Sequence, residues 1–422
     1  MSVWPVKGGD NAGRGTRLPW IGVLALAALA ATSPRPSHLP FLATSGPPIR
    51  PGIDVWQAGG FEPLAGKRVG LITNDTGRTG RDVLTAAVLA NSPAIELAAI
   101  FSPEHGFAAL LEGDVADSFD SATGLPIHSL YGDTRRPTAE MLNGLEGLVF
   151  DIQDIGTRFY TYATTLAYCM EEAARRDLPI IVLDRPNPIG GVAISGPVLD
   201  ESLLAFVGYA PVPTRHGMTI GELAQYFNDE RGIGAELTVI RAEGWRRSMW
   251  YDETGLSWHN PSPNIRNLTQ ALLYPALGPL EWTNISVGRG TDAPFEWFGA
   301  PWLNAPVLAA ALNAAELPGL RFIPRRLTPA GSMYAGEDCA GIDLIVTDRE
   351  KFDAGLTAAT LATTLGRLHT VEWERSRLPA LWGDPAILTQ LRSGMDAHAV
   401  AASWSRAMQE FQRIRSRYLL YD

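Results

Sequence analysis

Short apolar runs that alternate with helical segments are the feature of this sequence that most restricts its fold. The runs in the first half of the chain are RVGLIT (68–73), IELAAIF (95–101), GLVFDI (147–152) and PIIVL (179–183). Runs that are apolar throughout are typical of strands buried on both faces of a parallel sheet. Helical patterns lie between them, as parallel strands need crossover connections. The sequence therefore predicts an α/β fold with a parallel sheet covered by helices on both faces.

Polar clusters rich in Gly and Pro follow directly after three of these runs. They are SPEHG (102–106), DIQDIGTR (151–158) and DRPNP (184–188). In an open parallel sheet, ligands bind beyond the carboxyl ends of the strands. We therefore expect the three clusters to meet at one edge of the sheet and to form the functional site there.

The chain changes character in its second half. A strand–loop–helix unit is expected over 213–230, where Thr219 and Glu222 fit an N-cap and capping box. Loop-rich sequence with many Trp, Asn, Gly and Pro residues follows, and Ala-rich helical segments and a further strand come after it. We predict a larger domain over residues 51–300 and a smaller α+β domain over residues 301–422.

The N-terminal segment has the order of a secretory signal peptide. Basic residues up to Arg17 precede an uncharged apolar stretch over 18–31, which ends in small residues. We predict a signal peptide over residues 1–31, a flexible linker over residues 32–50, and export to the periplasm or the extracellular space. The alternative is an uncleaved membrane anchor, although the apolar stretch is short for a membrane span.

Charge and motif content argue against several classes of function. The net charge is −10 at pH 7 and no Lys/Arg run occurs, so nucleic-acid binding is not expected. The nucleotide-binding patterns GxGxxG and GxxxxGKS/T are missing, so no nucleotide cofactor is expected. Cys169 and Cys339 lie outside any CxxC pattern and no HExxH occurs, so no metal site is expected. The two cysteines could form a disulfide, but the helical pattern around Cys169 favours buried thiols.

Glu104 is the best candidate for a catalytic acid. It comes directly after the run 95–101, where burial can raise the pKa of a carboxyl, as a general acid requires. A loop ion pair or a helix cap is its structural alternative. Asp151 ends another run and could act as base or nucleophile, with a structural ion pair to Arg158 as its alternative.

Further polar residues in the loop clusters are candidates for substrate binding. Arginines could hold a carboxylate, tyrosines and asparagines could hydrogen-bond a sugar, and a His beside a helix N-terminus could accompany a bound anion. These candidates are Arg158, Tyr162, Asn187, Arg215, His216, Asn264, Glu281 and Arg289. Each also has a structural alternative, such as a turn with local hydrogen bonds or a buried ion pair.

Seven motifs in order resemble those of one family. LITNDTG, FSPEHGF, DIQDIGTRFYTY, LDRPNPIGG, RHGMTIGELA, SPNI and ALLYPALGPLEWTNISVGRGT are similar to motifs of the exo-β-N-acetylmuramidases of the NamZ type, over residues 53–422. The resemblance implies a Rossmann-like larger domain, a smaller C-terminal domain and an active site in the cleft between them. It also implies release of N-acetylmuramic acid (MurNAc) from the non-reducing ends of peptidoglycan fragments, without a nucleotide.

Site residues can be carried over from the family motif by motif. Glu104 of SPEHG matches the family's proposed catalytic acid, and we count His105 and Asp151 with it as catalytic candidates. Other residues match positions in the family's cleft, namely Arg158, Tyr162, Asn187, His216, Glu281 and Arg289. LITNDTG departs locally from the family, since Asp75 stands where a more neutral residue is expected.

We therefore expect a glycoside hydrolase that acts on fragments such as the disaccharide of MurNAc and N-acetylglucosamine (MurNAc–GlcNAc), with Glu104 protonating the leaving oxygen. The second reacting group is either Asp151 or the substrate's own acetamido oxygen. Two other functions stay open at this point. One is a different cell-wall hydrolase, such as an esterase or amidase, and the other is a protein that binds muropeptides without cleaving them.

Overall fold

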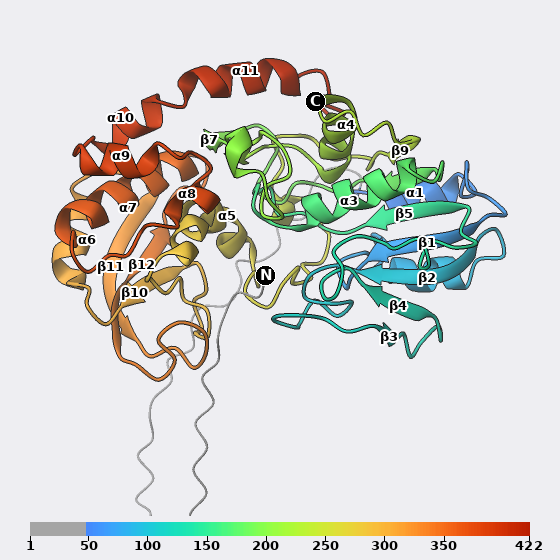
Figure 1. Ribbon diagram of the computed structural model, residues 1–422, viewed down its shortest axis with the longest axis horizontal. Coiled ribbons are helices and arrows are strands. Elements are labelled where there is room, and N and C mark those ends of the chain that lie inside the picture. Colours follow the sequence, from blue (N-terminus) through green and yellow to red (C-terminus); the bar gives the residue numbers. More distant parts are fainter. Residues whose placement is uncertain (1–47) are drawn as a thin grey trace, which may run out of the picture. The chain divides into compact units, whose positions relative to one another are not determined.

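The computed structural model describes residues 48–422 (Figure 1). The predicted signal peptide, residues 1–31, and most of the predicted linker, residues 32–50, lie outside the described residues. Between residues 48 and 422, no helix is both long enough and apolar enough to cross a membrane.

A seven-stranded sheet dominates the first half of the described chain (Figure 1). Its strands, in the order β3-β4-β2-β1-β5-β6-β9, are Ser118–Phe119, Pro126–Ser129, Glu96–Ser102, Arg68–Thr73, Gly147–Asp151, Ile180–Leu183 and Leu237–Ile240. Every neighbouring pair is parallel except β3 with β4. The prediction of a parallel α/β sheet is therefore confirmed for most of the sheet, and the four apolar runs form β1, β2, β5 and β6.

Both faces of this sheet are buried, which explains why its strands are apolar throughout. Side chains alternate between the two faces of a strand. Leu71 and Val149 accordingly join one core cluster, whereas Ile72 and Phe150 join another. Helices α1 (Gly52–Ala58) and α2 (Thr85–Ala90) pack into the first cluster. The second cluster includes residues of α3 and α4, which span Tyr162–Ala174 and Ile220–Glu230.

The strand order places a switch point between β1 and β5. The chain runs from β1 outward to β2 and β4, and then returns to β5 on the other side of β1. Thr73 and Asp151, the last residues of β1 and β5, are neighbours in the sheet. Ligand sites in open α/β sheets lie beyond the carboxyl ends of the strands at such a point. The three polar clusters of the sequence follow the ends of β2, β5 and β6, as expected.

The second half of the chain carries a smaller antiparallel sheet and the remaining helices. The sheet has the order β10-β12-β11, with bounds Trp297–Ala300, Cys339–Val346 and Leu320–Leu327. Helices α5 to α11 span Leu268–Leu277, Ala305–Asn313, Ala354–Leu368, Leu378–Trp382, Ile387–Arg392, Ala397–Ala402 and Ser405–Arg415. Short 3₁₀ helices span Glu201–Leu203, Tyr251–Glu253 and Gly278–Trp282. Because β10 pairs with β12, this sheet begins just before residue 301, the expected start of the smaller domain.

The region that connects the two sheets contains a small hairpin-like pair and a capped helix. Helix α4 begins as predicted, with Thr219 and Glu222 forming a capping box. The strand before it, β8 (Pro213–Arg215), pairs with β7 (Ser195–Val198) and not with the large sheet. In the two halves, Cys169 and Cys339 are both buried free thiols, as the helical pattern around the first one favoured.

Candidate functional site

Glu104 lies directly after the carboxyl end of β2, as the sequence predicts. Its side chain is half-buried, and the Thr161 hydroxyl donates a hydrogen bond to its Oε2. The Tyr162 hydroxyl donates to its backbone carbonyl oxygen at 3.3 Å, and the Tyr131 hydroxyl lies within hydrogen-bonding reach of its carboxyl. Groups that follow β4 and β5 therefore hold the Glu104 carboxyl, while the side chain keeps contact with solvent.

The Thr161 side chain hydrogen-bonds to Glu104 and does not cap its own helix. It stands at the N-cap of α3, where a Thr side chain normally accepts a hydrogen bond from a backbone N–H of the first turn. In this protein the side chain makes no such cap, and its hydroxyl donates to Glu104 instead. The helix forgoes a contribution of about 1 kcal/mol. Local rules of folding are broken in this way mainly at functional sites.

Three tyrosines lie around Glu104. Burial raises the pKa of Tyr131, and the neighbouring Glu104 carboxylate raises it further. Burial also raises the pKa of Tyr160 and of Tyr162. The rings of these two pack edge to face with their centroids 4.8 Å apart. All three phenols therefore stay protonated at neutral pH and can donate hydrogen bonds to a carboxylate or a sugar.

A charged group lies against the loop that carries Glu104. Asn264 Nδ2 donates to Oε1 of Glu112, a residue of that loop, at 2.7 Å. Arg289 Nε donates to Glu281 Oε1 at 2.5 Å, and NH1 of Arg289 lies 3.8 Å from Glu112 Oε1. Glu112 thus joins the loop after β2 to Asn264, which precedes α5, and to Arg289, which lies between α5 and β10.

Tyr274 on α5 connects this charged group to Glu104. Its ring packs against Tyr160 with centroids 6.0 Å apart. Burial raises the pKa of Tyr274, and the carboxylates of Glu281 and Glu104 both add to the shift. The structure therefore brings together about half of the residues that the sequence singled out, namely Glu104, His105, Tyr162, Asn264, Glu281 and Arg289.

His105 holds the conformation of the Glu104 loop. Its φ of +70° lies in the left-handed region, which residues other than Gly rarely adopt. Its Nδ1 lies 2.7 Å from the carbonyl oxygen of Leu111, and its own carbonyl accepts hydrogen bonds from the N–H groups of Leu110 and Leu111 at 3.1 Å. These contacts indicate a positioning role, and a direct catalytic role for His105 stays a prediction.

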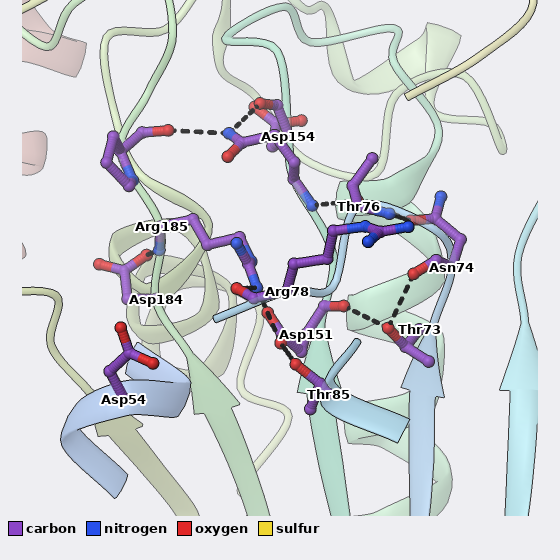
Figure 2. A network of polar contacts seen from close by, with 12 residues as sticks. Asp54, Thr73, Asn74, Thr76, Arg78, Thr85, Asp151, Asp154, Asp184 and Arg185 are labelled. Atoms are coloured by element: carbon purple, nitrogen blue, oxygen red, sulfur yellow. Dashed lines mark hydrogen bonds and ion pairs between the residues drawn. The ribbon is translucent and has the colours of Figure 1, made fainter. Parts of the chain in front are cut away.

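Asp151 is fully buried, which argues against its predicted role as base or nucleophile. Figure 2 shows Arg185 and Thr85 on either side of its carboxylate. Arg185 donates Nε to Oδ1 at 2.5 Å and NH2 to Oδ2 at 2.9 Å, and the Thr85 hydroxyl donates to Oδ2. Both oxygens are occupied and no surface is left for water or a sugar. Asp151 therefore forms the structural ion pair that was its alternative, but with Arg185 and not with Arg158.

Arg158 and Arg215 are also buried, so their predicted contact with substrate finds no support. Arg158 donates to the backbone carbonyls of Pro197, Val212, Leu381 and Trp382. Its partners come from distant parts of the chain, so this guanidinium fastens the C-terminal helices to the first half. Arg215 donates to the Ile189 carbonyl. Burial lowers the pKa of Arg158 to about 9 and that of Arg215 to about 10.

Asn187 and His216 stabilise loops from inside the protein. Asn187 Nδ2 donates to the Met218 carbonyl at 2.9 Å, and its Oδ1 accepts from the Ile189 N–H at 3.1 Å. His216 Nδ1 accepts from the Met218 N–H at 3.1 Å. Both side chains are buried. Their predicted contact with substrate is therefore replaced by the turn contacts that were the structural alternative.

A separate small hollow opens beyond the carboxyl ends of β1 and β5. Its lining includes Thr76, Arg78, Gln153, Arg185, Tyr251 and His259. Glu104 does not line it, and the ion pair between Arg185 and Asp151 already neutralises the charges at its base (Figure 2). We centre the candidate site on Glu104 because its carboxyl meets solvent and is surrounded by donors.

Sequence reasoning missed four residues of this site, namely Tyr131, Thr161, Glu112 and Tyr274. Tyr274 lies inside a helix among apolar residues. Tyr131 follows β4, whose four residues PIHS do not form an apolar run. Thr161 has the sequence of an ordinary helix start. Glu112 lies in a loop with no recognisable pattern. Closeness in the chain to Glu104 and to Tyr162 could have pointed to Glu112 and Thr161, whereas no such signal marks Tyr131 or Tyr274.

The fold and the site together define a class of protein. An accessible carboxyl, protonated phenols and an arginine surround one edge of an α/β sheet, and this set suits acid–base chemistry on a hydroxyl-rich substrate. Comparison with protein families then gives the family. The model for the N-terminal part of the exo-β-N-acetylmuramidase NamZ matches residues 69–269, and the model for its C-terminal part matches residues 272–421. The chain belongs to this family of glycosidases, and the resemblance seen in the sequence is confirmed.

Individual relatives agree with the family models. The peptidoglycan β-N-acetylmuramidase NamZ of Bacillus subtilis (strain 168) is 41% identical over 380 residues, which cover 89% of this chain and 92% of the relative. Crystal structures of two DUF1343 family proteins from Bacteroides fragilis NCTC 9343 match with TM-scores of 0.82 and 0.72, at 37% and 30% identity. Each match covers 89% of this chain and 99% of the solved chain.

Proposed function

We propose that this protein releases N-acetylmuramic acid from the non-reducing ends of peptidoglycan fragments, and that Glu104 is the acid that protonates the leaving oxygen. The observation that carries the assignment of Glu104 is its environment: a half-buried carboxyl at a strand end, with Thr161 and Tyr131 beside it. The relative from Bacillus subtilis bears the name of this activity. The sugar supplies many hydroxyl and amide groups that the surrounding phenols can hydrogen-bond.

We place the substrate between the large sheet and the C-terminal part of the chain. Glu104 and Tyr162 come from the sheet side, and Glu281 and Arg289 come from the segment between α5 and β10. The contacts of Glu112 with Asn264 and Arg289 support this placement, because they join the two sides at the site. The six parallel strands, numbered along the chain, have the order 3-2-1-4-5-6, which supports a Rossmann-like larger domain.

The substrate's acetamido oxygen is our proposal for the second reacting group, since Asp151 is sealed by Arg185. Glu104 gives its proton to the oxygen of the leaving sugar, the bond from C1 to that oxygen breaks, and the acetamido oxygen bonds to C1. Water then attacks C1 of the resulting oxazolinium ion, the bond from C1 to the acetamido oxygen breaks and restores the acetamido group, and Glu104 takes up a proton of the water. Substrate assistance of this kind is a recognised exception to the scheme with two carboxylates.

Product analysis tests the proposed reaction. Purified protein is incubated with MurNAc–GlcNAc, and mass spectrometry is expected to find free MurNAc and free GlcNAc in equal amounts. Intact disaccharide that stays bound would favour a binding protein, and loss of an acyl group would favour an esterase or amidase. A series of substrates with one, two and three fluorines on the acetyl group tests the second step. The ratio kcat/KM should fall steeply along this series, because fluorine withdraws electrons from the attacking oxygen.

Export is a further part of this proposal. The basic, apolar and small-residue order of residues 1–31 supports cleavage by a signal peptidase, and peptidoglycan lies outside the cytoplasmic membrane. N-terminal sequencing of protein recovered from the periplasm or the medium should begin at Thr32. A protein that keeps its first 31 residues in the membrane fraction would show that the segment is an anchor.

A further inference from the structure

The lactyl group of N-acetylmuramic acid needs a binding site in this protein if the proposed function is right. This group is the only difference between the sugar and N-acetylglucosamine, and it ends in a carboxylate. A carboxylate that leaves water needs a cation and hydrogen-bond donors. The seven family motifs contain four arginines that could serve this purpose, namely Arg158, Arg185, Arg215 and Arg289.

Three of these four arginines have other functions. Arg185 binds Asp151, and both are buried. Arg158 is buried and donates to four backbone carbonyls. Arg215 is buried as well and donates through NH2 to the Ile189 carbonyl. Bringing a substrate carboxylate to any of them would require the surrounding loops to open. Arg289 differs, because 27% of its side chain is exposed and it lies in the charged group beside the Glu104 loop.

The Arg289 guanidinium is held in place by its neighbours but can still donate further hydrogen bonds. Its Nε donates to Glu281 at 2.5 Å, and its guanidinium lies over the Phe295 ring at 5.3 Å. On its other side, NH1 lies 3.8 Å from Glu112, which is too long for a hydrogen bond. A carboxylate that came closer to NH1 could gain the charge-assisted hydrogen bond that Glu112 does not make.

Glu112 occupies this place only loosely. Its side chain is 57% exposed, and its hydrogen bond comes from the neutral amide of Asn264. A solvent-exposed ion pair with this geometry contributes little stability. Glu112 also lies eight residues after Glu104 on the same loop. Its displacement by a ligand would therefore move the loop that positions the Glu104 carboxyl.

We propose that Arg289 binds the lactyl carboxylate of the substrate, and that Glu112 occupies the same place in the free enzyme and leaves it when the substrate enters. This assignment rests on the proposed function and names the residue that selects muramyl over glucosaminyl ends. Glu281 stays on Arg289 throughout and keeps the guanidinium oriented. Glu112 is thus an internal competitor of the substrate, and the two residues should respond to substitution in opposite directions.

Matched substrates separate this role from a structural one. The two substrates are MurNAc–GlcNAc and the same disaccharide with its lactyl carboxyl converted to the neutral amide. Wild type should prefer the carboxylate form by tenfold to a hundredfold in kcat/KM, the range expected of a hydrogen-bonded charge pair. Arg289→Gln should lose this preference, chiefly by a higher KM for the carboxylate form.

Glu112→Gln provides the second and opposite expectation. The amide oxygen can still accept from Asn264, but the negative charge that competes for Arg289 is gone. KM for the carboxylate substrate should therefore fall several-fold while KM for the amide substrate stays unchanged. A merely structural role for Glu112 would raise both KM values or change neither.

Two other arginines near the site serve as comparisons. Arg266 donates to the carbonyls of Pro263 and Thr291, and Arg135 lies over the Tyr131 and Phe206 rings. Retention of the carboxylate preference in Arg289→Gln would overturn the assignment, and its loss in Arg266→Gln or Arg135→Gln would then identify the arginine that binds the carboxylate. A Glu112→Gln variant with raised KM for the carboxylate form would also overturn the assignment. Failure of wild type to cleave either substrate would instead count against the proposed function.

Discussion

The hydroxyl of Thr161 donates to the carboxylate of Glu104 and leaves the first turn of α3 without a side-chain cap. Since the helix gains nothing from this hydroxyl, its removal should change activity more than stability. Thr161→Val keeps the shape of the side chain, and we expect kcat/KM to fall about tenfold, as for one hydrogen bond to a charged group. Thr161→Ser should restore most of the activity. A variant that loses stability but keeps full kcat/KM would show that the hydroxyl serves folding.

Asp151→Asn tests whether this carboxylate is structural. The substitution leaves the buried Arg185 without its counter-charge, and breaking such a pair typically costs about 3–5 kcal/mol of unfolding free energy. We expect urea unfolding to show a loss of this order, while protein that remains folded keeps kcat within a few-fold of wild type. A variant of normal stability with kcat reduced a thousandfold would return Asp151 to the role of nucleophile or base.

Arg158→Met tests the second correction to the sequence analysis. The guanidinium donates to four buried carbonyls, two of them at Leu381 and Trp382. Leaving such acceptors unpaired should lower the unfolding free energy by about 3 kcal/mol or more. KM for MurNAc–GlcNAc should stay unchanged at a temperature where the variant is folded. A large rise in KM with unchanged stability would show that Arg158 meets the substrate after all.

Asp184 should make stability depend on pH. Burial raises its pKa to about 6, whereas an unfolded Asp has a pKa of about 3.9. Between these values the folded state keeps a proton that the unfolded state releases, so the unfolding free energy falls as pH rises from about 4 to about 6. Relative to Asp184→Asn, wild type should lose about 2–3 kcal/mol across this window. Urea unfolding at several pH values measures this difference, and parallel pH profiles of the two proteins would contradict it.

The large sheet could be predicted because its signal is local. Strands buried on both faces must be apolar throughout, and β1, β2, β5 and β6 stand out for that reason. The shorter strands could not be found in this way. β4 contains a half-buried His128 and β9 has only half-buried side chains, so neither carries a continuous apolar run.

The site could be predicted only in part, because the sequence does not show whether a polar residue at a strand end faces solvent or a buried partner. Glu104 lies two residues after a buried strand and Asp151 ends another, and no local sequence pattern shows which of them faces solvent. The difference comes from Arg185 at the next strand end, which closes over Asp151. Arg158 has carbonyl partners more than 200 residues away in the chain. No sequence pattern predicts a contact between residues so far apart.

Direct comparison of wild type with Glu104→Gln on MurNAc–GlcNAc tests the central assignment. Gln keeps the size of the side chain and can still accept from Thr161, so the two proteins should unfold at the same temperature. Removing a general acid should lower kcat by at least a hundredfold and up to about ten-thousandfold. A Glu104→Gln variant that is folded and releases MurNAc within a few-fold of the wild-type rate would contradict the account.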